Sequence, residues 1–181
     1  MITTDLLALL PIITLTGVIL VVMMVIAFAR NLALTCLCCS MGLALTLAAI
    51  AWVSINLEPQ YVTPLIVVDE YALLFSSIIV IGAFFICLLA YSYHADRGEN
   101  QDEYLMLMLL STLGGIILAH SAHFASFILG LELVGVSLYA MISYPVRGFF
   151  SLEAALKYLI LSGVSSATLL FGIAFLFAVT G

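Results

Sequence analysis

The chain has 181 residues, of which 66% are hydrophobic and only 8% are charged. A soluble domain averages about 25% charged residues, so this composition excludes an ordinary soluble protein and indicates an integral membrane protein in a lipid bilayer. Ten acidic residues against four basic ones give a formal net charge of -6, and this shortage of Lys and Arg argues against nucleic-acid binding and against a polybasic lipid-binding patch.

Six apolar segments are long enough, or nearly long enough, to span a bilayer, which requires about 20 apolar residues per helix. Backbone groups in lipid must pair within their own segment, which favours helices. The predicted fold class is therefore all-α, a polytopic membrane protein with about six transmembrane helices. The predicted helices are Leu6–Ala29, Leu32–Ile55, Tyr71–Tyr93, Tyr104–His120, Ala122–Tyr144 and Ala154–Val179.

Two features interrupt this pattern. Pro11 falls in the first turns of the first helix, where a missing N–H costs little. In the link between the second and third helices, the apolar, β-branched piece Tyr61–Val68 predicts a short extended segment at the membrane surface. Elsewhere, small residues at helical spacing predict close helix packing, namely Ser111, Gly115 and Ala119 in one helix and Ser162 and Ser166 in another.

Cysteine and histidine give weak signals. All four cysteines lie inside apolar runs, and their C-x-C-C spacing fits no zinc or haem pattern, so we interpret them as packed structural residues. His120 and His123 straddle a turn and lack a third ligand, which argues against a metal site and indicates interfacial or proton-handling side chains. The cysteines are Cys36, Cys38, Cys39 and Cys87.

The three arginines predict the orientation in the membrane. Arg30, Arg97 and Arg147 follow the first, third and fifth predicted helices, and the links at the other side contain no Lys or Arg. By the positive-inside rule the arginine side is cytoplasmic. Both ends of this chain are then expected on the outer side.

Glu132 is the candidate functional residue that costs most to place in lipid. It lies near the middle of Ala122–Tyr144 and is the only charged residue in that segment. A carboxylate at this depth costs roughly 2.5–3.5 kcal/mol, and residues of this kind usually belong to ion or proton pathways. The alternative is a neutral, hydrogen-bonded structural acid. A helical projection places Ala125, Ile128, Gly135, Val136, Tyr139 and Ser143 on the same face.

Glu153 and Lys157 form the second candidate site. Their i,i+4 spacing, acid first, is the favourable order for an ion pair on a helix. Two interpretations remain open: a charged pair that takes part in proton movement, or a helix-capping acid beside a lysine that extends to the membrane surface. We find no phosphate-binding loop, nucleotide fingerprint or nucleophile triad in the sequence, and so expect no covalent chemistry.

Several motifs carry a family resemblance. They are LGLEL within Phe127–Met141, LEAALKY within Ser151–Gly163, TPLIVVDEYALLF at Thr63–Phe75, DEYLMLML at Asp102–Leu109 and the closing Leu170–Gly181. With these motifs the sequence resembles subunit N of the proton-pumping NADH-quinone oxidoreductase, respiratory complex I, which belongs to the antiporter-like subunit family. The likeness runs over the whole chain.

The resemblance implies a role for each candidate residue. In this family two inverted repeats of five helices translocate protons, and Glu132, Glu153 and Lys157 match the family's charged positions. Residues 1–103 would be three leader helices, and residues 104–181 the first three helices of the first repeat. Family members have about fourteen helices, so we expect an N-terminal fragment whose lysine partner for Glu132 lies on a later helix.

The function implied by the resemblance is that of a membrane subunit of NADH-quinone oxidoreductase, which couples electron transfer from NADH to quinone to proton translocation. No cofactor is expected in this subunit, since FMN, iron–sulfur clusters and quinone would lie on partner subunits. The expected partners are other membrane subunits of complex I, and the expected location is a bacterial inner membrane with both chain ends periplasmic. The alternatives are a subunit of a multi-subunit Na⁺/H⁺ antiporter, which shares the LGxEL helix, and a non-transporting membrane scaffold.

Overall fold

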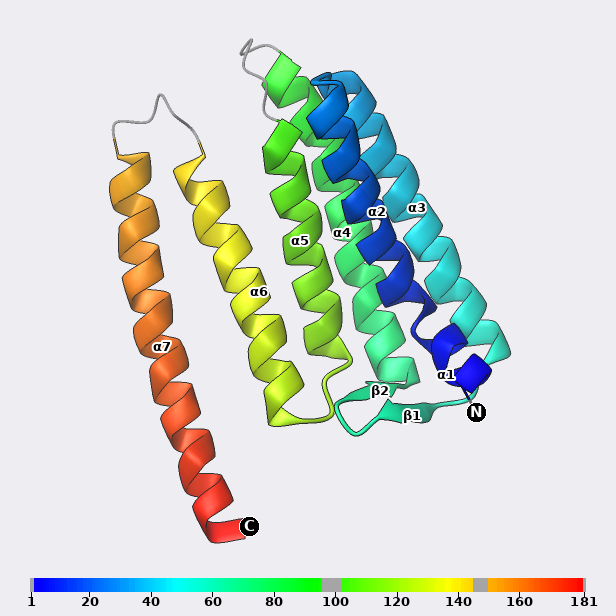
Figure 1. Cartoon of the computed structure of the whole chain (residues 1–181), viewed down its shortest axis with the longest axis vertical. Helices are drawn as coiled ribbons and strands as arrows, with labels where there is room; N and C mark the ends of the chain where they lie inside the picture. The colour runs from blue at the N-terminus through cyan, green and yellow to red at the C-terminus, as the bar shows by residue number, and fades with distance from the viewer. Residues whose placement is uncertain (1, 96–101, 145–149, 181) are drawn as a thin grey trace.

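Six helices in the computed structural model are long and apolar enough to cross a membrane, which confirms the predicted all-α polytopic fold. The structure describes residues 2–95, 102–144 and 150–180 (Figure 1). Its elements are α1 (Ile2–Ala8), α2 (Leu10–Phe28), α3 (Leu32–Asn56), β1 (Gln60–Thr63), β2 (Ile66–Val68), α4 (Glu70–Ala95), α5 (Asp102–Ala119), α6 (Phe124–Ser143) and α7 (Ser151–Thr180).

The first predicted helix is divided in two at Leu9. Pro11 lies at the start of α2 and has no N–H to donate to the carbonyl of Leu7, so the helical hydrogen-bond ladder is interrupted there. Leu9 N still donates to Asp5 O (3.2 Å), and Ile13 N donates to Leu9 O (3.0 Å). The chain therefore bends between α1 and α2 while it remains helical on both sides (Figure 1).

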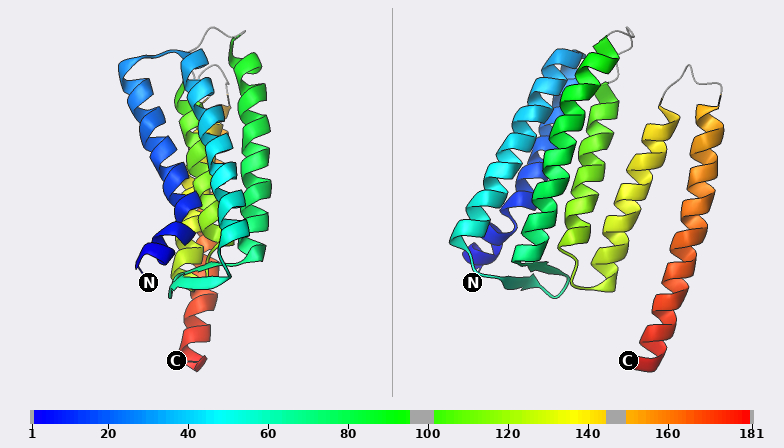
Figure 2. Two further views of the ribbon diagram at one scale, coloured as in Figure 1. Left: turned by 90° about the vertical axis from the view of Figure 1, so that its right-hand side faces the viewer. Right: turned by 180° about the vertical axis from the view of Figure 1, so that it is seen from behind.

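Helices α2 to α5 pack together as one bundle, because α5 contacts α2, α3 and α4 while α3 contacts α2 and α4. Helix α6 then packs along α5, and α7 packs along α6 at the edge of the molecule (Figures 1 and 2). We call the end where α3, α5 and α7 begin the Arg30 end, and the opposite end the hairpin end. Arg97 and Arg147 lie outside the described residues.

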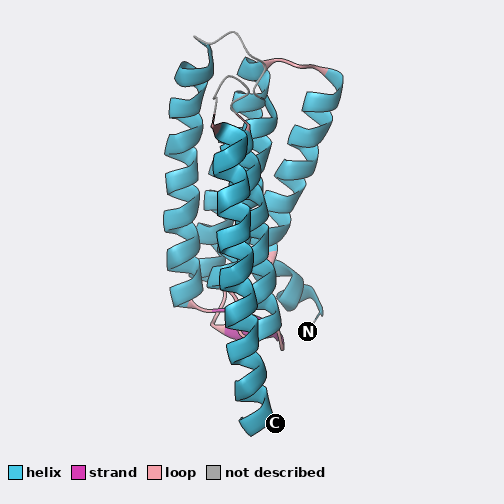
Figure 3. Cartoon of the chain, turned by 90° about the vertical axis from the view of Figure 1, so that its left-hand side faces the viewer, coloured by secondary structure: helices cyan, strands magenta, loops and turns pink. Residues whose placement is uncertain are grey.

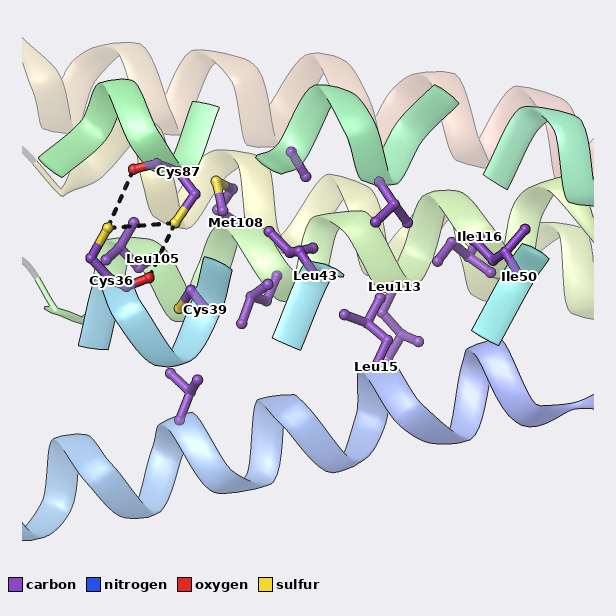
Figure 4. Packing of buried hydrophobic residues seen from close by; sticks show 14 of the residues in the cluster. Leu15, Cys36, Cys39, Leu43, Ile50, Cys87, Leu105, Met108, Leu113 and Ile116 are labelled. Carbon is purple, nitrogen blue, oxygen red and sulfur yellow. Dashed lines mark hydrogen bonds between the residues drawn. The ribbon is translucent and has the colours of Figure 1, made fainter. Parts of the chain in front are cut away.

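The core of the bundle is apolar and includes cysteine. Leu15, Leu43 and Leu105 are fully buried between α2, α3 and α5. The Sγ atoms of Cys36 and Cys87 lie 3.7 Å apart as free thiols, and Figure 4 shows them beside the aliphatic side chains. These cysteines are packed core residues, as the sequence predicts.

Helices α5 and α6 approach closely through two glycines. A Cβ added to Gly130 would lie 2.9 Å from Leu118 N and 3.1 Å from Gly114 O, and a Cβ on Gly114 would lie 2.9 Å from Val134 N. The two backbones therefore touch at Gly114 and Gly130. The predicted small residue Gly115 faces Ile79 of α4, where an added Cβ would lie 3.4 Å from its Cδ1, so Gly114 and not Gly115 meets α6.

The predicted extended segment is a β-hairpin. Strands β1 and β2 pair antiparallel, and they lie at the same end of the molecule as both described chain ends (Figure 3). The hairpin is fastened to the α5–α6 link: Val67 N donates to His120 O and Ala122 N to Leu65 O, both at 2.9 Å. Ser126 Oγ also donates to Leu65 O at 2.7 Å.

Helix α7 differs from the others in length and burial. Its 30 residues give a length of about 45 Å, which exceeds the roughly 30 Å hydrocarbon core of a bilayer. Figure 1 shows its C-terminal turns extending past the hairpin end. Ala155 is its only buried residue among those described, so nearly all of its surface is left uncovered by α2 to α6.

Candidate functional site

Glu132 lies near the middle of the membrane span. It is the ninth of the 20 residues of α6, a helix about 30 Å long. Its side chain is exposed and makes no hydrogen bond or ion pair with any residue that the structure describes. The exposed strip of α6 that it shares consists of Ala125, Leu129, Val136 and Ser143.

This strip faces neither neighbour of α6. Gly130 and Ser137 are buried on the side that meets α5, and Ser137 Oγ is satisfied by Leu133 O at 2.7 Å. Gly135, predicted to share the face of Glu132, is turned toward α7, where an added Cβ would lie 3.6 Å from Ser162 Oγ. Glu132 is therefore free to meet a group outside α2–α7.

The predicted ion pair on α7 is present. Lys157 Nζ lies 2.6 Å from Glu153 Oε1, and the two side chains are 71% and 55% exposed. Exposed pairs at this spacing contribute only about 0.3–0.5 kcal/mol to stability. This pair therefore contributes little to the stability of the fold.

The structure does not bring Glu132 and Lys157 together. Gly135 of α6 is level with Ser162 of α7; Glu132 lies three residues from Gly135 toward the hairpin end, and Lys157 lies five residues from Ser162 toward the Arg30 end. At 1.5 Å per residue, the two charged residues are separated by about 12 Å along the helix axes. Lys157 also points away from α6, because it lies about 140° around α7 from Ser162.

A hollow of about 450 Å³ lies beside this contact, lined by hydroxyl groups of α7. Ser162 and Ser166, which the sequence suggested were packing residues, make no hydrogen bond within the part of the chain described. Thr168, by contrast, donates to Val164 O at 2.8 Å. Unpaired hydroxyls in a hollow of this size can hold water. The lining residues are Leu131, Tyr158, Leu161, Ser162, Ser165, Ser166 and Leu169.

A polar cluster at the Arg30 end was not predicted from the sequence. Arg30 lies 3.5 Å from Glu103, whose other carboxylate oxygen accepts a 2.5 Å hydrogen bond from the Tyr144 hydroxyl. Burial, and then the hydrogen bond to Glu103, raise the pKa of Tyr144 well above its usual value, so its phenol stays protonated and donates. The acidic DE pair that opens α5 is the only sequence signal for this cluster, since its partners come from other segments.

His120 is buried rather than interfacial. His120 is 1% exposed, and its Nδ1 donates a hydrogen bond to Ile116 O at 2.9 Å. Ser76 Oγ lies 3.4 Å from the same Nδ1. Burial lowers the pKa of His120, so the ring is neutral inside the hairpin end. His123 instead is the N-cap of α6, where its Nδ1 accepts a hydrogen bond from Ala125 N at 3.1 Å. No three His, Cys, Asp or Glu residues in the described ranges could hold a metal ion together.

Two comparisons with known proteins bear on the fold and on the region that contains the candidate residues. Residues 121–181 match the family model described as NADH:quinone oxidoreductase/Mrp antiporter, transmembrane, and this region contains Glu132, Glu153 and Lys157. A chain of respiratory complex I from Thermus thermophilus, solved with bound aureothin, matches 94% of this chain with a TM-score of 0.81 and 25% identity. This is the fold of a complex I/Mrp antiporter-like membrane subunit.

The chain spans 37% of the length of the Thermus chain that it matches. The region that matches the family model comprises α6, α7 and the turn before them, whereas α1 to α5 are matched by the structural comparison alone. The division into leader helices and a first repeat stays a prediction. All three candidate residues fall in the family region.

Proposed function

We propose that this chain takes part in proton translocation as part of subunit N of an NADH-quinone oxidoreductase. The observation that carries the proposal is Glu132, a carboxyl near mid-depth with an exposed side chain and no partner in the described structure. Such a residue in lipid requires a polar or charged neighbour, and groups of this kind usually lie on ion or proton paths. The match to a chain of respiratory complex I supports the same assignment.

Glu132 would act by changing its charge. A positive group that approaches the carboxyl favours its ionised form, and withdrawal of that group favours uptake of a proton. The exposed strip of α6 gives such a group direct access to Glu132. Electron transfer would take place on partner subunits, which would hold the FMN, the iron–sulfur clusters and the quinone.

Glu153 and Lys157 would adjust charge and hydration nearer the Arg30 end. Their ion pair is closed at 2.6 Å, so movement of Lys157 away from Glu153 would release both charges at once. The proposed location is a bacterial inner membrane with the Arg30 end cytoplasmic and both chain ends periplasmic, since Arg30 lies at that end.

The test is Glu132→Gln in the complete, assembled complex, with NADH-driven proton pumping as the readout. Loss of pumping with normal assembly is expected, because an amide has the shape of the acid but cannot release a proton. Lys157→Ala should lower pumping without preventing assembly. Wild-type pumping in a normally assembled Glu132→Gln complex would refute the proton-carrying role and favour a scaffold.

A second candidate follows from the family model itself, which includes Mrp antiporters. In that case the chain would belong to a multi-subunit Na⁺/H⁺ antiporter, and Glu132 would serve Na⁺-coupled exchange. Na⁺/H⁺ exchange that continues without NADH in vesicles would favour this candidate, whereas pumping that requires NADH would favour the oxidoreductase.

A further inference from the structure

Asp102 is a buried carboxyl that the proposed function has not used. It lies at the first residue of α5 and is only 1% exposed. Neither of its carboxylate oxygens has a hydrogen-bond partner among the residues that the structure describes. The Thr35 hydroxyl lies beside it but donates to Asn31 O at 3.1 Å instead.

The neighbouring acid has the opposite environment. Glu103 is 38% exposed and is engaged by Arg30 at 3.5 Å and by Tyr144 at 2.5 Å. The two adjacent carboxyl groups thus differ in environment: Glu103 is ionised and paired, whereas Asp102 is buried and has no partner among the described residues. Such contrasting pairs commonly divide proton-handling roles between them.

The charged and titratable groups around Asp102 come from every side. Arg30 lies in the α2–α3 link, Glu103 on α5 itself, and Tyr144 at the end of α6. On α3 the Thr35 side chain interacts with Asp102, and on α4 Tyr93 interacts electrostatically with Tyr104. Arg30 is therefore the cation within reach of both acids among the described residues, and its 67% exposed side chain has room to move.

We propose that Asp102 is a proton-binding residue and forms, with Glu103, Arg30 and Tyr144, a proton-loading site at the Arg30 end. A buried carboxyl without a partner is held in its neutral form. When Arg30 turns from Glu103 to Asp102, the positive charge favours ionisation of Asp102, and its proton passes to Glu103 or to water at the surface. When Arg30 returns to Glu103, Asp102 takes up a proton again.

The surroundings close one side of this site and give it one contact with another helix. Leu105 and Leu109, on the same face of α5 in the next two turns, are fully buried and close the route into the bundle. The hydrogen bond from Tyr144 to Glu103 joins the site to α6, the helix that carries Glu132. Tyr144 lies 12 residues from Glu132, or about 18 Å along α6, so further groups or water must lie between them.

The inference rests on the proposed proton translocation, and its test separates the two. In the assembled complex, Asp102→Asn should lower the rate of NADH-driven pumping about tenfold. Loss of a directly reacting acid or base typically lowers a rate by roughly 10²-fold or more, and the smaller effect is expected here because water and Glu103 still reach the site. Infrared difference spectra should show a protonated-carboxyl band that Asp102→Asn removes. Glu70→Gln, an exposed acid in the first turn of α4 at the hairpin end, is the matched control and should change neither.

Arg30→Gln tests the switch directly and does not depend on the stability of the Asp102 variant. Without the arginine charge, the carboxyl band should persist at pH values at which the wild-type protein loses it. The inference would be overturned by a wild-type complex that lacks the band, by an Asp102→Asn complex that keeps it, or by an Asp102→Asn complex that pumps normally. If Glu132→Gln abolishes pumping while Asp102→Asn does not, only the loading site is refuted; if neither variant affects pumping, the proposed function falls as well.

Discussion

The contact between α5 and α6 positions the helix that carries Glu132, and a single methyl group added at Gly130 should disrupt this contact. In Gly130→Ala the new Cβ would lie 2.9 Å from Leu118 N, whereas ordinary van der Waals contact begins at 3.4 Å. The obstacle is backbone, so no side-chain rotation relieves it, and the two helices must separate by about half an ångström. Overpacking of this kind costs typically 1–3 kcal/mol.

Two further effects adjust this magnitude. Alanine gains about 1 kcal/mol over glycine in a helix interior, which offsets part of the cost. A separation of half an ångström or more also forfeits a quarter or more of the dispersion energy of each contact along the α5–α6 interface. The expected net loss for Gly130→Ala is about 1–2 kcal/mol.

The matched control is Gly82→Ala in the middle of α4, where an added Cβ meets nothing within 4 Å. This variant should be unchanged or more stable by up to about 1 kcal/mol. Denaturant or thermal unfolding of both variants in the same detergent should therefore separate them by about 2 kcal/mol. Equal stability of the two variants would show that the backbones of α5 and α6 do not touch at Gly130.

Two other predictions concern the ends of the bundle. Burial holds the pKa of His120 below its usual value of 6.5, so the contribution of the neutral ring to stability is present above pH 6.5 and is lost as the pH falls through the lowered value. Unfolding temperatures measured between pH 5 and 8 should show this loss of stability. In His120→Gln the unfolding temperature should depend less on pH. For the orientation, a membrane-impermeant thiol reagent should label Arg30→Cys from the cytoplasmic side and Glu58→Cys, at the hairpin end, from the other side; the reverse pattern would overturn the proposed topology.

The six spans could be predicted because their signal is length and apolarity, which a sequence displays directly. The break at Leu9 could not be placed, although Pro11 was noted, because a proline in the first turns of a helix is compatible with one helix or two. The sequence also does not tell that Gly114, and not Gly115, meets α6. Both glycines lie on α5, and only the direction in which α6 approaches decides which of them is in contact.

The site divides in the same way. The ion pair of Glu153 and Lys157 is local, so its spacing was sufficient to predict it. The cluster around Glu103 joins three segments that are far apart in the sequence, and the burial of His120 depends on the hairpin that covers it. Neither feature has a local sequence pattern, because both depend on how the helices pack in three dimensions.

The bonds between the hairpin and the α5–α6 link have a consequence for biosynthesis. A chain inserted from its N-terminus delivers residues 60–68 to one side of the membrane before residues 120–126 have been made. Until α5 has crossed and α6 has begun, Val67 N–H and Leu65 C=O have no partner there and form a free strand edge. The hairpin that follows the second span is thus completed only when the fourth and fifth spans are in place. A nascent chain stopped after α4 would expose an unpaired strand edge that could pair with another chain.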